Sequence, residues 1–204
     1  ADLDDTTACQ VYNNFPEIAG QGVVTYFNFD NTDRKPITVK VALSAVSTEG
    51  ALKNLKAEAE GLTFEQARAK NEALWEKELA CIDVEGSEDQ KAMIYTSLYH
   101  TLINPSIYMD VDRKYRGVDG NIHEAKDFDN YTIFSVWDTY RAEHPFLQLV
   151  KPEHNLNMVK SMIAHQQQNR LHMLPVWSLM GNEGWCMTGY HAVTVVADAL
   201  VKGA

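Results

Sequence analysis

Residues 174–191 read LPVWSLMGNEGWCMTGYH, and this stretch decides most of what the chain can be. It places a carboxylate, an amide, two tryptophans, a tyrosine and a histidine between glycines. We interpret it as a junction of a loop and a helix, with Asn182 as the N-cap and Glu183 in the first turn. Aromatic rings beside a carboxylic acid suit sugar chemistry, because rings cover the flat faces of a pyranose and the acid can protonate a glycosidic oxygen.

A purely local role for Glu183 is the alternative, since an acidic residue in a first helical turn stabilises the helix dipole without further purpose. A pocket walled by Trp177 and Trp185 would favour the protonated acid, whereas a helix N-terminus would favour the carboxylate. The sequence does not decide whether the protonated or the ionised form of Glu183 is favoured. His191 follows Glu183 by two turns and is expected either to line the same cleft or to be a satisfied core histidine.

A second polar cluster is SVWDTYR at residues 135–141. Asp138, Thr139 and Arg141 offer an acceptor, a hydroxyl and a fork-shaped donor to sugar hydroxyls. The local alternative is that Asp138 caps a helix and pairs with Arg141 three residues later. The two readings are compatible, because an ordered ion pair can still bind a hydroxyl.

Composition excludes several classes of protein. The 204 residues are 45% hydrophobic, which is enough to bury a sizeable core. A net charge of −10 argues against a nucleic-acid or anionic-membrane surface, which needs clustered Lys and Arg. No apolar run approaches the length of a membrane span. The chain begins at Ala1 with no signal peptide, as expected for a secreted protein without its leader or for a fragment of a longer chain.

Metal motifs are weak in this sequence. The three cysteines are widely spaced and predict isolated thiols, and neither CxxC nor HExxH occurs. His165 and His172 are seven residues apart, and we expect exposed or capping roles for them. The acidic loop at residues 110–121 fails as an EF-hand, because Tyr115 stands where glycine is needed and Asn121 where glutamate is needed. We interpret this loop as a hairpin with its turn around residues 117–120.

The chain divides into three parts. Residues 1–49 predict the end of an antiparallel β-sandwich, with strands at 23–29 and 38–46 and a turn at 30–36. Two or three strands cannot form a stable sandwich alone, so part of that sheet is expected elsewhere. Residues 50–85 predict a helical linker, in which Thr63 and Gln66 form a capping box that starts a second helix.

Residues 86–204 predict the first part of a helical toroid whose loops build a site. A capping box of Ser87 and Gln90 opens a helix to about residue 102, and short strands and loops fill 106–136. Further helices are expected at 138–150, 153–170 and 183–201, with Gly203 as a C-terminal stop. In the helix that begins after Ser87, the side chains of Met93, Ile94, Leu98 and Leu102 are expected to face inward.

Together these motifs resemble a known family. The stretch 134–141 with Pro145 and Leu147, and the stretch 174–191, resemble two signatures of glycoside hydrolase family 92, the calcium-dependent, exo-acting α-mannosidases. A loop with Tyr115, Arg116 and Gly117 also fits. The resemblance covers roughly residues 88–204. Where the family usually has threonine after the glutamate, this chain has Gly184, which bears on local hydrogen bonding and linkage preference.

The resemblance implies a β-sandwich, a helical linker and an (α/α)6 toroid, and hydrolysis of terminal α-linked mannose with inversion. Glu183 corresponds to the general acid, and Asp138, with Arg141, falls where the family contacts the terminal mannose. Calcium is the implied cofactor, with most of its ligands, like the catalytic base, expected in the remaining C-terminal part of the same polypeptide. The 204-residue chain by itself is therefore expected to be inactive. The expected substrate-binding set also includes Trp177, Trp185, Asn182, Thr139 and His191.

The implied substrate is a mannose-containing glycan, with α-1,2-linked mannose expected. The resemblance to this family implies a location in the periplasm, at the cell surface or outside the cell. One alternative is a catalytically incomplete carbohydrate-binding or scaffold protein of the same fold. Another (α/α)6 enzyme, such as a phosphorylase, is a third hypothesis.

Overall fold

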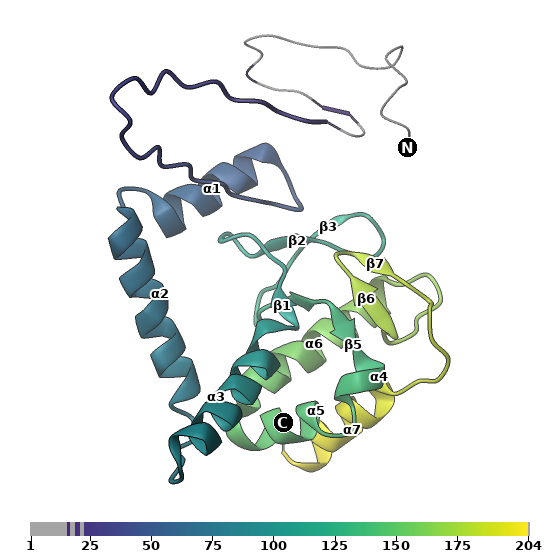
Figure 1. The fold of residues 1–204 in the computed structure, drawn as a ribbon. Coiled ribbons are helices and arrows are strands. Elements are labelled where there is room, and N and C mark those ends of the chain that lie inside the picture. The colour runs from purple at the N-terminus through teal and green to yellow at the C-terminus, as the bar shows by residue number, and fades with distance from the viewer. Residues whose placement is uncertain (1–15, 17–18, 21–22, 204) are drawn as a thin grey trace, which may run out of the picture. The chain divides into compact units, whose positions relative to one another are not determined.

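The computed structural model describes Pro16, residues 19–20 and residues 23–203 (Figure 1). The chain divides into two compact units, residues 1–37 and 38–204. Of the three cysteines, Cys81 and Cys186 are free, whereas Cys9 lies outside the described residues. The predicted site residues all belong to the second unit.

No strand is formed at 23–29 or 38–46 among the described residues, so neither expected strand pairs with a described neighbour. Tyr26 is 85% exposed and Leu43 is 83% exposed, so neither segment has the half-buried face that stabilises a sheet. The expected turn is present, and its Arg34 N–H donates to the Asn31 carbonyl at 3.1 Å. The β-sandwich expectation is therefore not confirmed by these residues.

Two helices occupy the stretch predicted to be a helical linker, α1 (Thr48–Ala59) and α2 (Phe64–Leu79). The Thr63–Gln66 capping box is confirmed: the Thr63 hydroxyl accepts the Gln66 N–H and the Gln66 side chain accepts the Thr63 N–H. α2 exposes most of its apolar side, and Phe64 is 70% exposed. Its Trp75 ring lies against Tyr99 of the next helix, with ring centroids 4.5 Å apart.

Helix α3 (Glu88–Ile103) begins at the predicted Ser87–Gln90 capping box. Leu98 is buried and Leu102 packs against the core, as predicted. The inward prediction is wrong for Met93 and Ile94, which are exposed. The residues of α3 that are buried or pack on the core or on α2, Leu98, Leu102 and Tyr99, lie in its C-terminal half, and periodicity alone could not tell which turns would be covered.

Three helices enclose the core of the second unit: α5 (Glu143–Val150), α6 (Pro152–Gln168) and α7 (Ala192–Val201), with the single turn α4 (Val136–Thr139) beside them (Figure 1). α5 packs against both α6 and α7, and α6 packs against α7. None of the helices in the described residues has the length and apolar character of a membrane span. The core side chains are Tyr131, Phe134, Val136, Leu147, Met158, Val159, Met162, Ala192, Val195 and Ala199.

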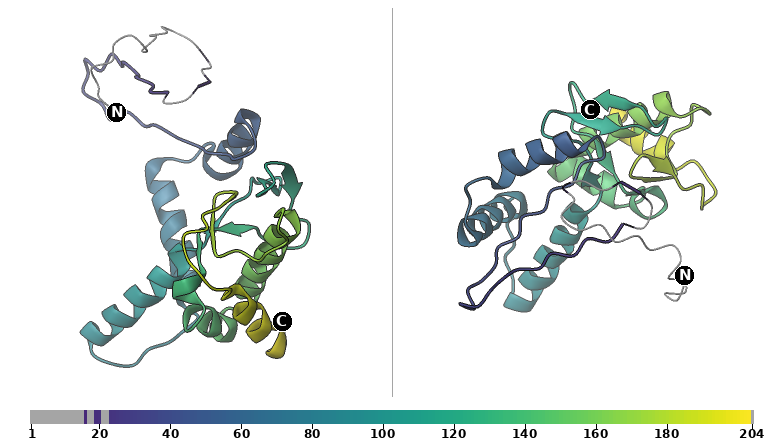
Figure 2. Two further views of the ribbon diagram at one scale, coloured as in Figure 1. Left: turned by 90° about the vertical axis from the view of Figure 1, so that its right-hand side faces the viewer. Right: turned by 90° about the horizontal axis from the view of Figure 1, so that it is seen from above.

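This arrangement is a helical group rather than a closed ring, so the toroid is not confirmed by it. Three small antiparallel sheets lie over one side of the group (Figures 1 and 2). They pair β1 (Ser106–Ile107) with β4 (Tyr131–Thr132), β2 (Lys114–Arg116) with β3 (Ile122–Glu124), and β5 (Phe134–Ser135) with β6 (Trp177–Leu179) and β7 (Asn182–Glu183).

The predicted helix over 183–201 is wrong in its first half. α7 starts at Ala192, and Asn182 and Glu183 belong to β7, so they neither cap nor open a helix. Met180 and Gly181 both have positive φ, 47° and 76°, as a two-residue type I′ hairpin requires. This turn folds β7 back onto β6. The predicted stop is confirmed, since Gly203 follows α7 with φ 91° and donates its N–H to Leu200.

A pair of leucines on α5 tests the placement of the core. Leu147 is fully buried, whereas Leu149 is 75% exposed on the same helix. Leu147→Ala is expected to lower the free energy of unfolding by about 2–5 kcal/mol, because it removes apolar contacts and leaves a cavity. Leu149→Ala is expected to stay within about 0.5 kcal/mol of the parent. Urea denaturation of both variants measures this, and equal losses would contradict the described core.

Candidate active site

Glu183 is buried at the end of β7 with its carboxylate turned inward. The side chain is 3% exposed. One oxygen, Oε1, accepts the backbone N–H groups of Trp177 at 2.8 Å and Trp185 at 3.2 Å, and the other, Oε2, accepts that of Val176 at 3.0 Å. An ionised carboxylate is an acceptor only, so it satisfies all three donors at once. The carboxylate thereby fastens the loop after β7 to the start of β6.

His165 on α6 is the fourth group around this carboxyl. Its Nε2 lies 3.5 Å from Glu183 Oε2, and its Nδ1 lies 3.2 Å from the Ser178 hydroxyl in β6. Burial lowers the pKa of His165, while the neighbouring Glu183 charge acts in the opposite direction. The ring is therefore neutral at pH 7, and it is the one member of the group that can accept a proton, since the other three are backbone N–H groups.

The exposed or capping role expected for His165 is wrong. The residue follows Met158 by seven positions and Met162 by three, which places it on the buried face of α6. Both methionines are fully buried and His165 is 8% exposed. Helical spacing from those methionines was the signal that could have identified it. His172, in contrast, lies exposed in the loop after α6.

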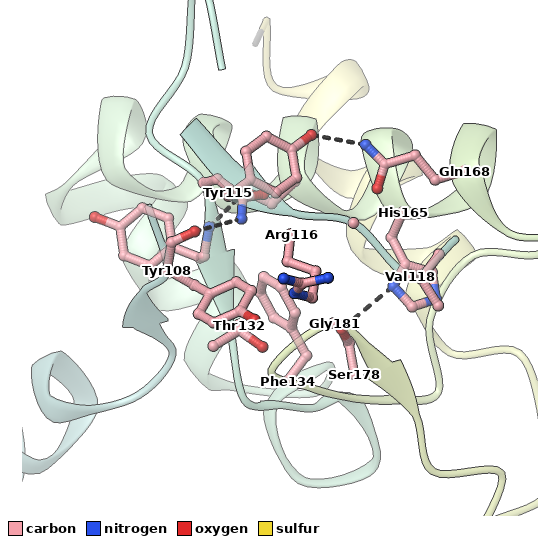
Figure 3. A pocket seen from close by; sticks show the side chains of 14 residues that line it. Tyr108, Tyr115, Arg116, Val118, Thr132, Phe134, His165, Gln168, Ser178 and Gly181 are labelled. Atoms are coloured by element: carbon pink, nitrogen blue, oxygen red, sulfur yellow. Dashed lines mark hydrogen bonds between the residues drawn. The ribbon is translucent and has the colours of Figure 1, made fainter. Parts of the chain in front are cut away.

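A small cavity adjoins His165 and is also lined by Gly181 of the β6–β7 hairpin turn. It measures about 20 Å³, which is enough for one water molecule. Figure 3 shows the His165 ring reaching Ser178 across its edge, with Gln168 donating to the Tyr115 hydroxyl at 2.7 Å. His165 and Ser178 thus lie between this polar cavity and Glu183. None of the eight site residues predicted from sequence lines it.

Asp138 occupies the single turn α4, where its carboxylate accepts the Ser135 hydroxyl. The described residues hold no ion pair between Asp138 and Arg141. Arg141 instead donates to the Tyr140 hydroxyl at 2.6 Å and lies over that ring. Asp138 and Arg141 are both exposed, so both remain accessible to a ligand.

Thr139 points away from solvent. Its hydroxyl donates to the Ser135 carbonyl at 3.2 Å, and the residue is buried. In this geometry Thr139 stabilises the short turn that carries Asp138. A direct contact with a sugar hydroxyl would require that internal bond to break.

His191 joins the two sequence clusters through its ring. It stacks on Tyr140 with ring centroids 4.2 Å apart, and it meets Trp137 edge-on at 4.5 Å. Trp137 also donates its indole N–H to the Thr188 carbonyl. These contacts fix the start of α7 against the segment that carries Asp138, so His191 is part of an aromatic cluster.

The two tryptophans of residues 174–191 differ in their settings. Trp177 is half-buried in β6, and its indole Nε1 is buried without a hydrogen-bond partner in the described residues. Trp185 is 49% exposed and holds a positive φ of 50°.

Asn182 is exposed, and its side chain makes a long hydrogen bond of 3.4 Å to the Met180 carbonyl. A Cβ at Gly184 would meet the Trp177 carbonyl at 3.3 Å, so the hairpin packs closely there.

Glu143 is a titratable residue that the sequence interpretation missed. It lies in the first turn of α5, and burial, with a smaller contribution from the Asp138 charge, raises its pKa to about 7. Its Oε1 is buried without a partner in the described residues. Glu143 precedes the fully buried Leu147 by four residues, and this spacing was the signal that it faces inward.

The three-stranded sheet brings the two clusters together. Ser135 of β5 pairs with Trp177 of β6, and Ser178 of β6 pairs with Glu183 of β7. Segments some forty residues apart in the sequence therefore form adjacent strands. The structure thus places the two clusters on adjacent strands, while the roles of Glu183, Asp138 and Arg141 in binding or catalysis stay predictions.

A metal site does not emerge from the residues present. Among residues 23–203, together with 16, 19 and 20, no three or more His, Cys, Asp or Glu side chains gather as metal ligands. The acidic loop at 110–121 uses its carboxylates internally: Asp110 accepts from Ser44 and Asn54, and Asp119 contacts His123. The described side chains do not fit a calcium cage.

Comparison with known proteins shows which family this chain resembles in sequence and structure. Residues 50–204 match the glycosyl hydrolase family 92 catalytic domain. The solved family GH92 alpha-mannosidase BT3965 from Bacteroides thetaiotaomicron, also determined in complex with mannoimidazole, is 53% identical with a TM-score of 0.76. The match covers 78% of this chain and 21% of BT3965.

A second solved relative is the family GH92 inverting mannosidase BT2199 from Bacteroides thetaiotaomicron VPI-5482. It is 31% identical with a TM-score of 0.72, over 78% of this chain and 22% of that protein. No curated protein matches the chain. The chain spans about a fifth of the length of these solved relatives.

The Glu183 carboxylate is expected to support the fold as well as any chemistry. Glu183→Leu leaves three backbone N–H groups without their acceptor; those of Val176 and Trp177 are part-buried, where an unsatisfied donor costs roughly 1–3 kcal/mol, whereas that of the exposed Trp185 can turn to water. We expect the free energy of unfolding to fall by at least about 2 kcal/mol in this variant. Asn182→Ala, in the same strand but exposed, serves as the control and should change stability by under about 0.5 kcal/mol. Urea denaturation that showed equal effects would contradict the described hydrogen bonds.

The raised pKa of Glu143 predicts that the free energy of unfolding depends on pH. Its folded pKa of about 7 lies above the ordinary 4.5, so the folded chain holds this proton more tightly than the unfolded chain. The resulting stabilisation is complete below about pH 4.5 and is lost as the pH rises through 7. Glu143→Gln is neutral at every pH, so it should lose less stability than the parent between pH 5 and 8, by about 1–2 kcal/mol after allowance for solvent screening.

The measurement is chemical denaturation of both proteins at the two pH values. Burial lowers the pKa of His144, His154 and His165, so these residues oppose Glu143 by adding stability as the pH rises. They contribute equally to parent and variant, and the difference between the two proteins isolates Glu143. Parallel pH profiles for parent and variant would show that Glu143 is ionised in the folded chain at neutral pH.

Proposed function

The chain belongs to glycosyl hydrolase family 92, and on that premise we propose that it is part of an inverting exo-α-mannosidase that removes terminal α-linked mannose from glycans. The observation that carries the proposal is the buried Glu183 carboxyl beside His165, in a sheet that also carries the Asp138 segment. The solved relatives of this chain are mannosidases, and BT2199 is an inverting one. We extend this activity to the longer protein of which this chain would form about a fifth.

Glu183 is the proposed general acid. In an inverting hydrolase one carboxylic acid protonates the leaving oxygen, while a second carboxylate activates water on the opposite face of the ring, with the two carboxyls about 6.5–9.5 Å apart. Glu183 supplies the first group. We place the second in the remaining part of the polypeptide.

The terminal mannose is proposed to contact the exposed Asp138 and Arg141, which offer an acceptor and charged donors to hydroxyls. Trp185 supplies an exposed ring, with Trp177 and Asn182 beside it in the hairpin. His191 and Thr139 would act by holding the Asp138 segment and α7 in place. α-1,2-linked mannose is the linkage we propose first.

Calcium belongs to this proposal only for the longer protein. The described residues provide no cluster of ligands for it, so no step of the reaction is assigned to the ion through this chain. Adding a chelator to the complete enzyme tests the requirement directly. The proposed location is the periplasm, the cell surface or outside the cell.

One observation favours a second candidate function. Both oxygens of Glu183 accept backbone N–H groups, an arrangement that a purely structural carboxylate would also adopt. The second candidate is therefore a carbohydrate-binding or scaffold protein that retains the fold. Such a protein would bind mannosides without turning them over.

Glu183→Gln in the complete enzyme separates these functions. Glutamine keeps the size of the side chain and a carbonyl acceptor but cannot donate an acid proton. We expect kcat for an unactivated α-1,2-mannobioside to fall by at least about 100-fold, since general acid catalysis contributes roughly 10²–10⁴. An activated dinitrophenyl mannoside should be hydrolysed nearly as fast as by the parent, because its leaving group needs no protonation.

The assay is steady-state kinetics on both substrates, with Leu149→Ala, an exposed position of α5 outside the proposed site, as the control. Near-parental turnover of the mannobioside by Glu183→Gln would refute the acid assignment. Mannoside binding by the parent without any turnover would instead support the binding protein.

A further inference from the structure

We propose that Tyr140 is a positioning residue that keeps Arg141 from pairing with Asp138, so that both side chains stay available to the hydroxyls of a bound mannoside. The inference rests on the proposed function, in which Asp138 and Arg141 contact the terminal mannose. It gives a role to a tyrosine that lies between these two residues in the sequence and that was not among the expected site residues.

Asp138 and Arg141 are placed to attract each other. Opposite charges three residues apart in a helical turn form favourable pairs, and both side chains are exposed. An ion pair between them would turn the carboxylate and the guanidinium toward one another and away from a ligand. The described residues nevertheless hold no such pair, because each side chain has another partner.

The partner of Arg141 is the Tyr140 hydroxyl. Arg141 Nε donates to this oxygen at 2.6 Å, and the guanidinium carbon lies 5.4 Å from the centre of the tyrosine ring. This bond uses one of the five N–H donors of the guanidinium and leaves the four on Nη1 and Nη2. Among the described residues, neither of these two nitrogens has a hydrogen-bond partner. The planar fork is therefore fixed at its base and free at its tip.

The Tyr140 ring is itself held in place. His191 stacks on it with ring centroids 4.2 Å apart and an angle of 9° between the planes. The ring also packs against the hydrophobic core, and the Tyr140 N–H donates to the Val136 carbonyl at 3.1 Å. Contacts with the start of α7, the core and α4 thus fix the hydroxyl, which cannot follow Arg141 toward Asp138.

Asp138 is anchored on its own side by Ser135. The Ser135 hydroxyl donates to Oδ2 of the carboxylate, and Oδ1 has no partner among the residues that the structure describes. One short segment therefore presents a free carboxylate oxygen and a free guanidinium tip. A sugar hydroxyl both accepts and donates hydrogen bonds, so separated acceptors and donors suit it better than a closed ion pair does.

The first test is Tyr140→Phe in the complete enzyme. Phenylalanine keeps the ring and its stack on His191, and it removes only the oxygen that accepts from Arg141. Arg141 can then pair with Asp138 and must be reoriented when the mannoside binds. We expect KM for the α-1,2-mannobioside to rise by about 3–10-fold, with kcat within about twofold of the parent, because ground state and transition state lose the same binding.

A double variant shows whether Tyr140 acts through Arg141. Arg141→Gln alone is expected to raise KM by at least as much as Tyr140→Phe. The double variant Tyr140→Phe/Arg141→Gln should match Arg141→Gln within about twofold, since the hydroxyl then has no guanidinium to hold. If Tyr140 only supported the fold, its effect on KM would instead multiply that of Arg141→Gln.

Salt gives a second measurement on the same proteins. An exposed ion pair formed between Asp138 and Arg141 in Tyr140→Phe is weakened by salt. Raising the sodium chloride concentration from about 0.01 M to about 1 M should therefore return KM of this variant toward that of the parent. The parent should respond little, because its substrate is neutral and its two charged groups are already apart.

Tyr95→Phe is the matched control. Tyr95 lies in α3, outside the proposed site, and its hydroxyl donates to the Ile82 carbonyl at 3.1 Å. This variant also loses one tyrosine hydroxyl with its hydrogen bond, and it should leave KM, kcat and their response to salt unchanged. Urea denaturation of Tyr95→Phe and Tyr140→Phe verifies that both remain folded.

The outcomes separate the inference from the proposed function. A parent enzyme that does not hydrolyse mannosides overturns the function and, with it, this role of Tyr140. An active parent overturns only the inference if Tyr140→Phe leaves KM unchanged, if its effect multiplies that of Arg141→Gln, or if its KM does not respond to salt. A salt-sensitive rise in KM that disappears in the Arg141→Gln background supports the positioning role.

Discussion

The C-terminal part of this structure depends on one buried carboxylate. Glu183 accepts the part-buried backbone N–H groups of Val176 and Trp177, which would otherwise lie unpaired, and the exposed N–H of Trp185. Buried backbone donors must be satisfied, and an ionised carboxylate can satisfy several at once. This requirement holds the loop after β7 against β6 and delays the start of α7 to Ala192.

The same hydrogen bonds place the carboxyl where chemistry is possible. They leave His165 as the titratable neighbour, and they keep Glu183 in the sheet that borders the Asp138 segment. A second carboxyl, that of Glu143, is close enough to Asp138 to feel its charge, and burial together with that charge raises its pKa to about 7. Structural support and the proposed role of general acid compete at Glu183, because the backbone donors that fix the side chain need it as an acceptor, whereas a general acid donates a proton.

Capping chemistry made the starts of two helices predictable from the sequence. Thr63 with Gln66 and Ser87 with Gln90 start helices where expected, because each box satisfies two backbone donors through residues three positions apart. The turn at residues 117–120 followed from glycine in the same way, with Gly120 at φ 78°. These features are local, so no distant contact was needed to foresee them.

Other features were decided by tertiary structure. The strand patterns at 23–29 and 38–46 found no partner in the described residues, and a strand is stable only when paired. The burial of His165 and Glu143 depends on which helix faces meet across the core, so their altered pKa values could not be read from composition.

The sequence by itself determined the family motifs, the helix starts at the two capping boxes and the identity of the carboxyl at position 183. Only the tertiary structure decided that this carboxyl would lie in a strand, closed by a hairpin turn at Met180 and Gly181, with a histidine from α6 at its side. The reason is physical: local signals fix backbone conformation over a few residues, whereas the surroundings of a side chain depend on segments that meet only after folding.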